Sequence, residues 1–211
     1  MAYRPTARTE HLRLQQRQAL VDAAQRLIRE GGFAALAIAP VAANAGLATG
    51  SFYRHFPGKA ELCAEIFRLA TQREVDMVRV VAARDVPCRE RLLQLIEAFC
   101  QRAMKGRTQA YALIAEPVDP LVEIERLHYR QQYSAIFSAL ISEGIQRREF
   151  PDQNADIAAA ALVGALAETL VGPLAMHRQK NTDFNSEEES ALIHAISQFC
   201  LRAITGKDTL P

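Results

Sequence analysis

A sharp break in an otherwise helical pattern, NAGLATGSFYRHFPGKAEL at residues 44–62, most constrains how this chain can fold. Gly46 can adopt the left-handed backbone that ends a helix abruptly, and the Pro57-Gly58 pair stops the next helix. Only a short helix fits between these two interruptions, and long helical patterns flank them on both sides. The spacing therefore predicts two short helices joined by a tight turn.

Apolar residues recur at helical spacing along nearly the whole chain, and no alternating strand pattern competes with them. A first apolar stripe begins near Leu20 and ends at Gly31-Gly32. Ser186 and Glu189 have the spacing of a capping box, which places the start of the last helix there. The pattern predicts an all-α chain of about nine helices. After the first, these helices are expected at residues 38–45, 49–55, 59 to the low eighties, 88–104, 107–115, 120–148, 154–176 and 186–205.

The charge of the chain is divided unevenly between its two parts. Residues 1–60 carry 8 Lys and Arg against 3 Asp and Glu, a net charge of +5, whereas residues 61–211 carry 17 against 21, a net charge of −4. A basic N-terminal module is typical of a domain that meets nucleic acid, although a solvated basic face has the same composition.

Two short helices after a longer one have the layout of a helix-turn-helix, whose recognition helix enters the major groove of DNA. Phe52 and Phe56 lie four residues apart and would anchor the third helix inward, against Leu27, Ile28 and Val41. Short donors, an aromatic hydroxyl and a guanidinium then remain at the helix start or on its outer faces, where they suit base edges and phosphates. These residues are Thr49, Gly50, Ser51, Tyr53, Arg54 and His55, with Lys59 as a phosphate contact at the start of the next helix.

The run APVAANAGLATGSFYRHFPGKAEL resembles the N-terminal signature of the TetR/AcrR family of bacterial transcriptional regulators. The resemblance implies a DNA-binding domain at residues 1–60 and a helical regulatory domain at residues 61–211 that binds a ligand and dimerises. It also implies DNA contacts at matching positions, which are Thr49, Gly50, Ser51, Tyr53, His55 and Lys59, with Arg54 at a variable position.

Two positions depart from the family pattern. Many members have a threonine where this chain has Ala37 and a serine where it has Ala48, so neither of these helices has a side-chain cap. Each missing cap costs about 1 kcal/mol of helix stability. A basic N-terminal arm precedes the module, and it either enters the minor groove or remains solvated; its arginines are Arg4, Arg8, Arg13 and Arg17.

The sequence predicts neither an enzyme nor a metalloprotein. No nucleophile elbow, phosphate-binding loop or zinc-binding pair of histidines is present, so no catalytic, metal or cofactor residue is assigned. The four cysteines have no paired spacing, which suits a reducing cytoplasm. Residues 155–176 are apolar and long enough to span a bilayer, but Asp156, Glu168 and many alanines favour a buried helix in a cytoplasmic protein without a membrane.

The C-terminal helices offer a place for a twofold partner and for a ligand. Small residues in helix 154–176 and the apolar stripe of helix 186–205 would form a four-helix interface in a homodimer, with intrachain packing as the alternative. The candidate interface residues are Ala160, Gly164, Ile193, Ile196 and Phe199. One face of helix 120–148 has a polar end and an apolar end, which would suit a mostly apolar effector with a polar or acidic end, centred on Arg130; ordinary core packing is the alternative. The candidate ligand residues are Tyr111, Glu116, Arg126, Tyr129, Arg130, Tyr133 and Phe137.

These features together predict a repressor that a small molecule releases from a pseudo-palindromic operator in double-stranded DNA. A ligand that favours a dimer with wrongly spaced recognition helices must weaken DNA binding by the same free energy. Two alternatives remain at this stage. One is a helix-turn-helix protein whose C-terminal helices serve only for assembly, and the other is a ligand-binding or enzymatic bundle in which the motif is incidental.

Overall fold

The computed structural model describes residues 7–180 and 184–206, with residues 176–180 described by their backbone only. All regular structure in these residues is helical, which confirms the all-α prediction. The elements are α1 (Ala7–Gly31), the 3₁₀ turn η1 (Phe33–Ala35), α2 (Ile38–Asn44), α3 (Thr49–Phe52), α4 (Lys59–Ala82), α5 (Cys88–Lys105), α6 (Arg107–Ile114), α7 (Pro120–Gln146), α8 (Ala155–Lys180) and α9 (Ser186–Thr205).

The predicted helices all occur, with three differences of detail. The predicted helix at 49–55 closes as an α-helix at Phe52 and continues as turns through His55. The arm arginines Arg8, Arg13 and Arg17 belong to α1, while Arg4 lies outside the described residues. The capping box of α9 lies one residue before the predicted pair, because the side chain of Asn185 accepts the backbone N–H groups of the first turn.

Two hydrophobic cores divide the molecule. The N-terminal core joins α1, α2 and α3 with the first turns of α4, through buried residues such as Leu62, Ile66 and Phe67. The C-terminal core begins further along α4, at Val75 and Val78. The domain boundary predicted at residue 60 therefore falls at the start of a helix that both cores share.

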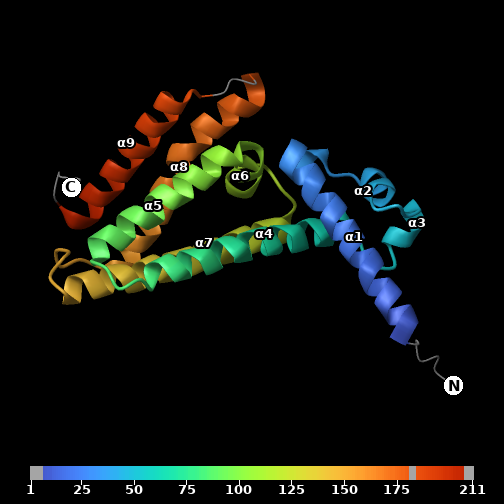
Figure 1. The fold of residues 1–211 in the computed structure, drawn as a ribbon, viewed down its shortest axis with the longest axis horizontal. Coiled ribbons are helices and arrows are strands. Elements are labelled where there is room, and N and C mark those ends of the chain that lie inside the picture. The colour runs from blue at the N-terminus through green and yellow to red at the C-terminus, as the bar shows by residue number, and fades with distance from the viewer. Residues whose placement is uncertain (1–6, 181–183, 207–211) are drawn as a thin grey trace.

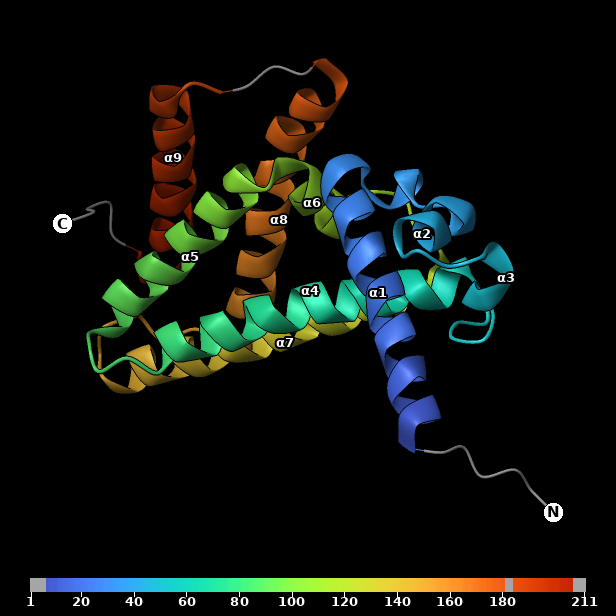
Figure 2. The ribbon, with the colours of Figure 1, turned by 45° about the vertical axis from the view of Figure 1, so that its right-hand side comes forward.

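The long helices α4 and α7 lie side by side and form the base of the C-terminal part (Figures 1 and 2). Helix α1 crosses near one end of this pair, with α2 and α3 on its outer side, while α5, α6, α8 and α9 lie over the rest of it. The last turns of α1 lie close to α6, so the N-terminal module contacts the C-terminal part through α6 as well as through α4.

Helix α8 is only partly covered. Its 21-residue segment Ala155–Ala175 has the length and composition of a membrane span, and 28% of its most apolar window is buried. The prediction that this helix is buried is therefore wrong for the isolated chain, because small residues line a face that no other described element covers.

Candidate functional site

The turn between α2 and α3 has the geometry that the sequence predicts. Gly46 has a φ of 69°, the left-handed region that favours glycine. The N–H of Gly46 donates to the carbonyl of Ala43, and the N–H of Leu47 donates to that of Ala42 at 2.9 Å. These bonds fix the direction in which α3 leaves the turn.

Two aromatic side chains hold α3 against the N-terminal core. Phe52 is fully buried and Phe56 is 3% exposed, with their ring centroids 5.7 Å apart, and both belong to the same cluster as Ile28 and Val41. The ring of Tyr53 packs edge-on against Phe52 at 5.5 Å, yet its side chain remains exposed. The inward anchoring predicted for Phe52 and Phe56 is confirmed.

The opposite side of α3 is free. Thr49, Gly50, Tyr53, Arg54 and Lys59 are exposed and Ser51 is half-buried. A methyl group on Gly50 would meet no atom within 4 Å, and no positive φ requires glycine there. Nothing in the chain itself thus explains this glycine, whereas a close-lying DNA backbone would. The N-caps Ala37 and Ala48 have no side-chain hydrogen bond, as predicted.

His55 differs from its predicted position on the outer faces. It is half-buried, and both ring nitrogens are buried and lack a hydrogen-bond partner among the described residues. Burial is the main cause that lowers the pKa of His55, and the positive charges of Arg13, Arg17 and Arg54 lower it further. Because the chain itself covers both ring nitrogens, His55 does not present a free donor in this structure, and its contact with DNA stays a prediction.

Arg17 likewise has a structural role. Its guanidinium forms a two-pronged ion pair with the carboxylate of Glu65 on α4, with Nη1 donating to Oε1 at 2.7 Å, and it also lies over the ring of Phe56 at 4.8 Å. These contacts tie α1 to α4 and to the end of the α3 turn. The predicted role of the arm in contacting DNA does not extend to this residue.

A buried carboxylate joins the two parts of the molecule. Glu116, in the connector between α6 and α7, is 3% exposed. Its two carboxylate oxygens accept the N–H of Phe33 at 2.9 Å and the N–H of Ala34 at 3.0 Å, both in η1 of the N-terminal module. Charge-assisted bonds to backbone N–H groups are among the stronger hydrogen bonds in proteins. We call this arrangement the Glu116 clamp.

Arg126 of α7 holds the same connector from its other side. Its guanidinium donates to the carbonyls of Ala112 and Leu113 at the end of α6 and, at 2.8 Å, to the carbonyl of Glu116. It also pairs with the carboxylate of Glu123 at 2.7 Å. The end of α6 is therefore fixed to α7 by Arg126 and to η1 by Glu116.

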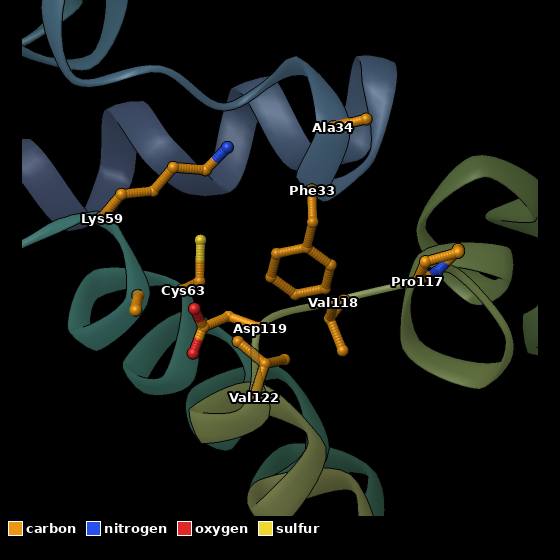
Figure 3. A pocket seen from close by; sticks show the side chains of 9 residues that line it. Phe33, Ala34, Lys59, Cys63, Pro117, Val118, Asp119 and Val122 are labelled. Carbon is orange, nitrogen blue, oxygen red and sulfur yellow. The ribbon is translucent and has the colours of Figure 1, made fainter.

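A cleft of about 440 Å³ lies beside the Glu116 clamp (Figure 3). Phe33 of η1 faces Val118 of the connector and Val122 of α7 across it, with Lys59 and Cys63 from the start of α4 along another side. Burial raises the pKa of the Cys63 thiol to about 11, so this thiol is protonated at neutral pH. The cleft marks the boundary between the module and the connector, next to a predicted phosphate contact.

The C-terminal part contains a cavity of about 130 Å³ between α4, α5, α6 and α7. We call it the inner cavity. Phe99 of α5, Tyr129 of α7 and Ile114 of α6 form apolar walls, and Arg102 of α5 forms its polar side with Glu74 of α4. The Nε of Arg102 donates to the carboxylate of Glu74 at 2.6 Å.

Two buried donors lie at or behind this cavity, Nη2 of Arg102 and the hydroxyl of Tyr133. Neither makes a hydrogen bond of good geometry among the described residues, although Tyr129 and Arg102 lie close enough to the Tyr133 hydroxyl to affect its pKa. The ring of Tyr133 packs at a tilt against Tyr129, with centroids 4.7 Å apart, and edge-on against Phe99 at 5.8 Å. Burial raises the pKa of Tyr133 to about 12, which keeps its hydroxyl a donor. A bound acceptor would relieve a cost of about 1–3 kcal/mol for each unsatisfied group.

Few of the predicted ligand residues meet here. Tyr129 lines the inner cavity and Tyr133 lies behind it, while Phe137 is fully buried core and Tyr111 packs against that core. The side chains of Glu116 and Arg126 instead form hydrogen bonds with backbone groups around the connector. Arg130 is exposed and lines neither the inner cavity nor the cleft beside the Glu116 clamp, so the structure does not support its predicted role.

Sequence reasoning missed Glu74 and Arg102, which are 28 residues apart on different helices. Their only local signal is the spacing of Phe99, Arg102 and Ala103, which share one face of α5. That face meets α4 only in the folded molecule, so no local sequence pattern indicates the contact.

The residues predicted for the dimer interface differ in their exposure. Ala160 and Gly164 of α8 and Phe199 of α9 are exposed, Ile193 is half-buried, and Ile196 is 4% exposed within the C-terminal core. Ile196 is therefore a core residue, which corrects its prediction. Ile157 of α8, 68% exposed, extends the same apolar face.

Fold and site together define a helix-turn-helix protein with a separate helical domain that contains a cavity. Family models agree with both parts: the model of bacterial regulatory proteins of the tetR family matches residues 20–66, and the model of the tetracycline repressor-like C-terminal domain matches residues 85–170. Together they cover more than half of the chain. The chain belongs to the TetR family.

Among curated proteins, the chain is similar to the HTH-type transcriptional repressor KstR2 of Rhodococcus jostii. The two are 29% identical over 124 residues, 59% of this chain. The match spans 60% of the length of that repressor.

Two solved structures share the fold over nearly their whole length. The fatty acid degradation regulator FadR of Bacillus halodurans has a TM-score of 0.72 at 20% identity, covering 88% of this chain and 94% of its own. FadR of Bacillus subtilis, in complex with stearoyl-CoA, has a TM-score of 0.72 at 20% identity, covering 89% and 98%.

Replacing Gly50 with alanine separates a structural role from a DNA-contacting one. Since the added methyl group meets no atom of the chain, we expect stability to stay within about 1 kcal/mol of the wild type. DNA affinity should fall, because the methyl group stands where the DNA backbone approaches. Thermal unfolding and fluorescence anisotropy on labelled operator measure the two effects. Unchanged DNA affinity would remove Gly50 from the interface.

Replacing Glu116 with glutamine tests the Glu116 clamp. The amide removes the charge and can accept only through one oxygen, so one N–H of η1 loses its buried acceptor. We expect a loss of about 1–3 kcal/mol in the free energy of unfolding by urea. Glu125→Gln removes the same charge from a half-exposed pair with Arg68 and should change stability by no more than about 1 kcal/mol. Equal effects of the two substitutions would show that the clamp is not a major contact.

Proposed function

We propose that this protein is a sequence-specific DNA-binding transcriptional repressor, released from its operator by a small molecule, and not an enzyme. The observation that carries the proposal is the free surface formed by α3, the turn after it and the first residue of α4. Its five exposed residues suit DNA, and the buried Phe52 and Phe56 lie behind it. The family membership supports regulation as the role of this surface. A bacterial regulator of this kind acts in the cytoplasm.

Selection of binding sites from a random DNA library tests this proposal. Tyr53→Ala and Lys59→Ala should weaken binding to all sequences, because these side chains lie at the rim where phosphates pass. Arg54→Ala and Ser51→Ala should change the selected sequence. The logarithm of wild-type affinity should fall with that of salt concentration, with a slope of about −0.9 per phosphate neutralised. Failure to enrich any sequence would refute the proposal.

A second copy of the chain is proposed as the partner that covers α8 and α9. Ile157, Ala160, Gly164 and Phe199 are exposed on these helices, and an apolar hollow of about 350 Å³ lies between them. A twofold axis would place the same surface of a second chain against it and form a four-helix interface. Two recognition helices then read the two halves of a pseudo-palindromic operator.

Phe199→Glu should convert this dimer to monomers, because it places a charge in the apolar interface. Sedimentation equilibrium at micromolar concentration measures the change, and operator affinity should fall with it. Val80→Glu is the matched control: Val80 is 67% exposed on α4, which packs mainly against α7 rather than against α8 or α9, so this variant should remain dimeric. A monomeric wild type, or a dimeric Phe199→Glu variant, would contradict the interface.

The effector is proposed to bind at the inner cavity. A carbonyl or carboxylate oxygen would accept from Arg102 Nη2, while an apolar body would contact Phe99, Ile114 and Tyr129. FadR of Bacillus subtilis binds an acyl thioester of this general chemistry, stearoyl-CoA. The effector is thus largely apolar with a polar or acidic end, as the sequence predicts, although the residues that hold it differ.

The same helix that lines the cavity leads to the DNA-binding module. Gln109, Leu113 and Ile114 of α6 form one wall of the inner cavity, next to Gly106 in the α5–α6 turn. Arg126 and Glu116 fasten the end of α6 to η1. A ligand that displaces α6 therefore displaces the module, and its preference for that state reduces operator affinity by the same free energy.

A further inference from the structure

The inner cavity is too small to enclose a whole effector. Its volume is about 130 Å³, whereas sites for drug-sized ligands occupy about 300–1,000 Å³. If the effector enters here, as the proposed function requires, most of the molecule must extend beyond it. The surroundings of the cavity then decide what the rest of the effector can be.

A larger cavity of about 520 Å³ adjoins the inner one on the side of α1. We call it the outer cavity. Four side chains of α4 and α6 line both, so a single layer of side chains separates them. These residues are Ala70, Glu74, Gln109 and Leu113.

The outer cavity has an excess of unpaired positive charge. Arg29, in the last turn of α1, and Arg73 of α4 line it and are exposed. Arg29 also lines a neighbouring hollow over the α5–α6 turn together with Lys105. Within the described residues, no ion pair or hydrogen bond engages the side chains of Arg29, Arg73 or Lys105.

The two carboxylates at the outer cavity are already engaged. Glu74 accepts from Arg102 at 2.6 Å, and Asp76 pairs with Arg79 at 3.4 Å. Two cations at the outer cavity, Arg29 and Arg73, and Lys105 in the neighbouring hollow that shares Arg29 therefore remain for a ligand. That number exceeds the single charge of a carboxylate and suits a head group with several negative charges.

We propose that the effector is an amphiphile with a phosphorylated, multiply charged head group, and that Arg29, Arg73 and Lys105 form its head-group site. The apolar part passes between Gln109 and Leu113 of α6 and Glu74 of α4 into the inner cavity. Guanidinium groups bind phosphate oxygens in a two-pronged geometry, and the lysine adds a point charge.

The head-group site joins both parts of the protein. Arg29 belongs to α1 of the DNA-binding module, while Arg73 and Lys105 belong to the helices around the inner cavity. A head group bound to all three contacts the module directly, in addition to its action through the Glu116 clamp. Because the head group contacts α1, the effector has a second way to stabilise one position of the DNA-binding module.

Calorimetric titration of the full chain with three ten-carbon probes tests the site: decanoyl-CoA, decyl phosphate and decanoate. Decanoyl-CoA should bind at least about tenfold more tightly than decanoate, since only its head group spans the three cations. The double variant Arg29→Gln/Arg73→Gln should reduce decanoyl-CoA affinity by about tenfold or more and leave decanoate affinity unchanged. Arg130→Gln removes an exposed arginine away from these cavities and serves as the control.

The affinities of the three probes distinguish the head-group site from its alternatives. Decyl phosphate binding as tightly as decanoyl-CoA would support the site and show that one phosphate suffices, whereas much weaker binding would support a larger phosphorylated head group. Equal affinity for decanoyl-CoA and decanoate, no binding of either phosphorylated probe, or a double variant that matches Arg130→Gln would overturn the site. Operator selection is independent of these titrations, so a failure of the head-group site is distinguishable from a failure of the proposed regulator function.

Discussion

The Glu116 clamp is the buried polar contact that joins the connector after α6 to the N-terminal module, and the proposed communication between the two parts rests on it. Its buried carboxylate accepts two backbone N–H groups of η1. Arg126 donates to the backbone carbonyl of Glu116 itself and to the carbonyls of Ala112 and Leu113 at the end of α6. A buried carboxylate without these donors would be strongly destabilised, so the connector and η1 have little freedom to move independently. Any displacement of the end of α6 therefore reaches the N-terminal core, which in turn supports α3.

Helix α4 provides the second connection. Its first turns belong to the core that holds α3, and its later turns line the inner and outer cavities. The ion pair between Glu74 and Arg102 lies at the point where these cavities meet, and it leaves Nη2 of Arg102 without an acceptor. One helix thus contacts the proposed DNA surface through its packing and the proposed effector through its side chains, which explains why the two sites need no direct contact.

Helix α8 shows how composition can mislead about burial. Its apolar length has the properties of a membrane span or of a core helix, yet in the single chain only part of its surface packs, mainly against α7 and α6 and less against α9 and α5. The exposed face is rich in alanine and glycine, which allow close approach of another helix. The proposed second copy of the chain would cover this face, because an isologous twofold contact places the same surface of both chains together.

The sequence by itself determined the all-α fold, the turn at Gly46 and the inward anchoring by Phe52 and Phe56, because these depend on local backbone preferences and on spacing within one helix. The outer residues of α3 followed from the same periodicity, apart from His55, whose direction depends on a turn that the helical pattern does not include. Only the tertiary structure decided the roles of Glu116, Arg126 and Arg102. A buried polar residue has no local signature of its partner: Glu116 bonds to backbone 82 and 83 residues away, and Arg102 to a carboxylate 28 residues away. The cavity and the junction arise where helices distant in sequence meet, and that meeting is a property of the packed molecule alone.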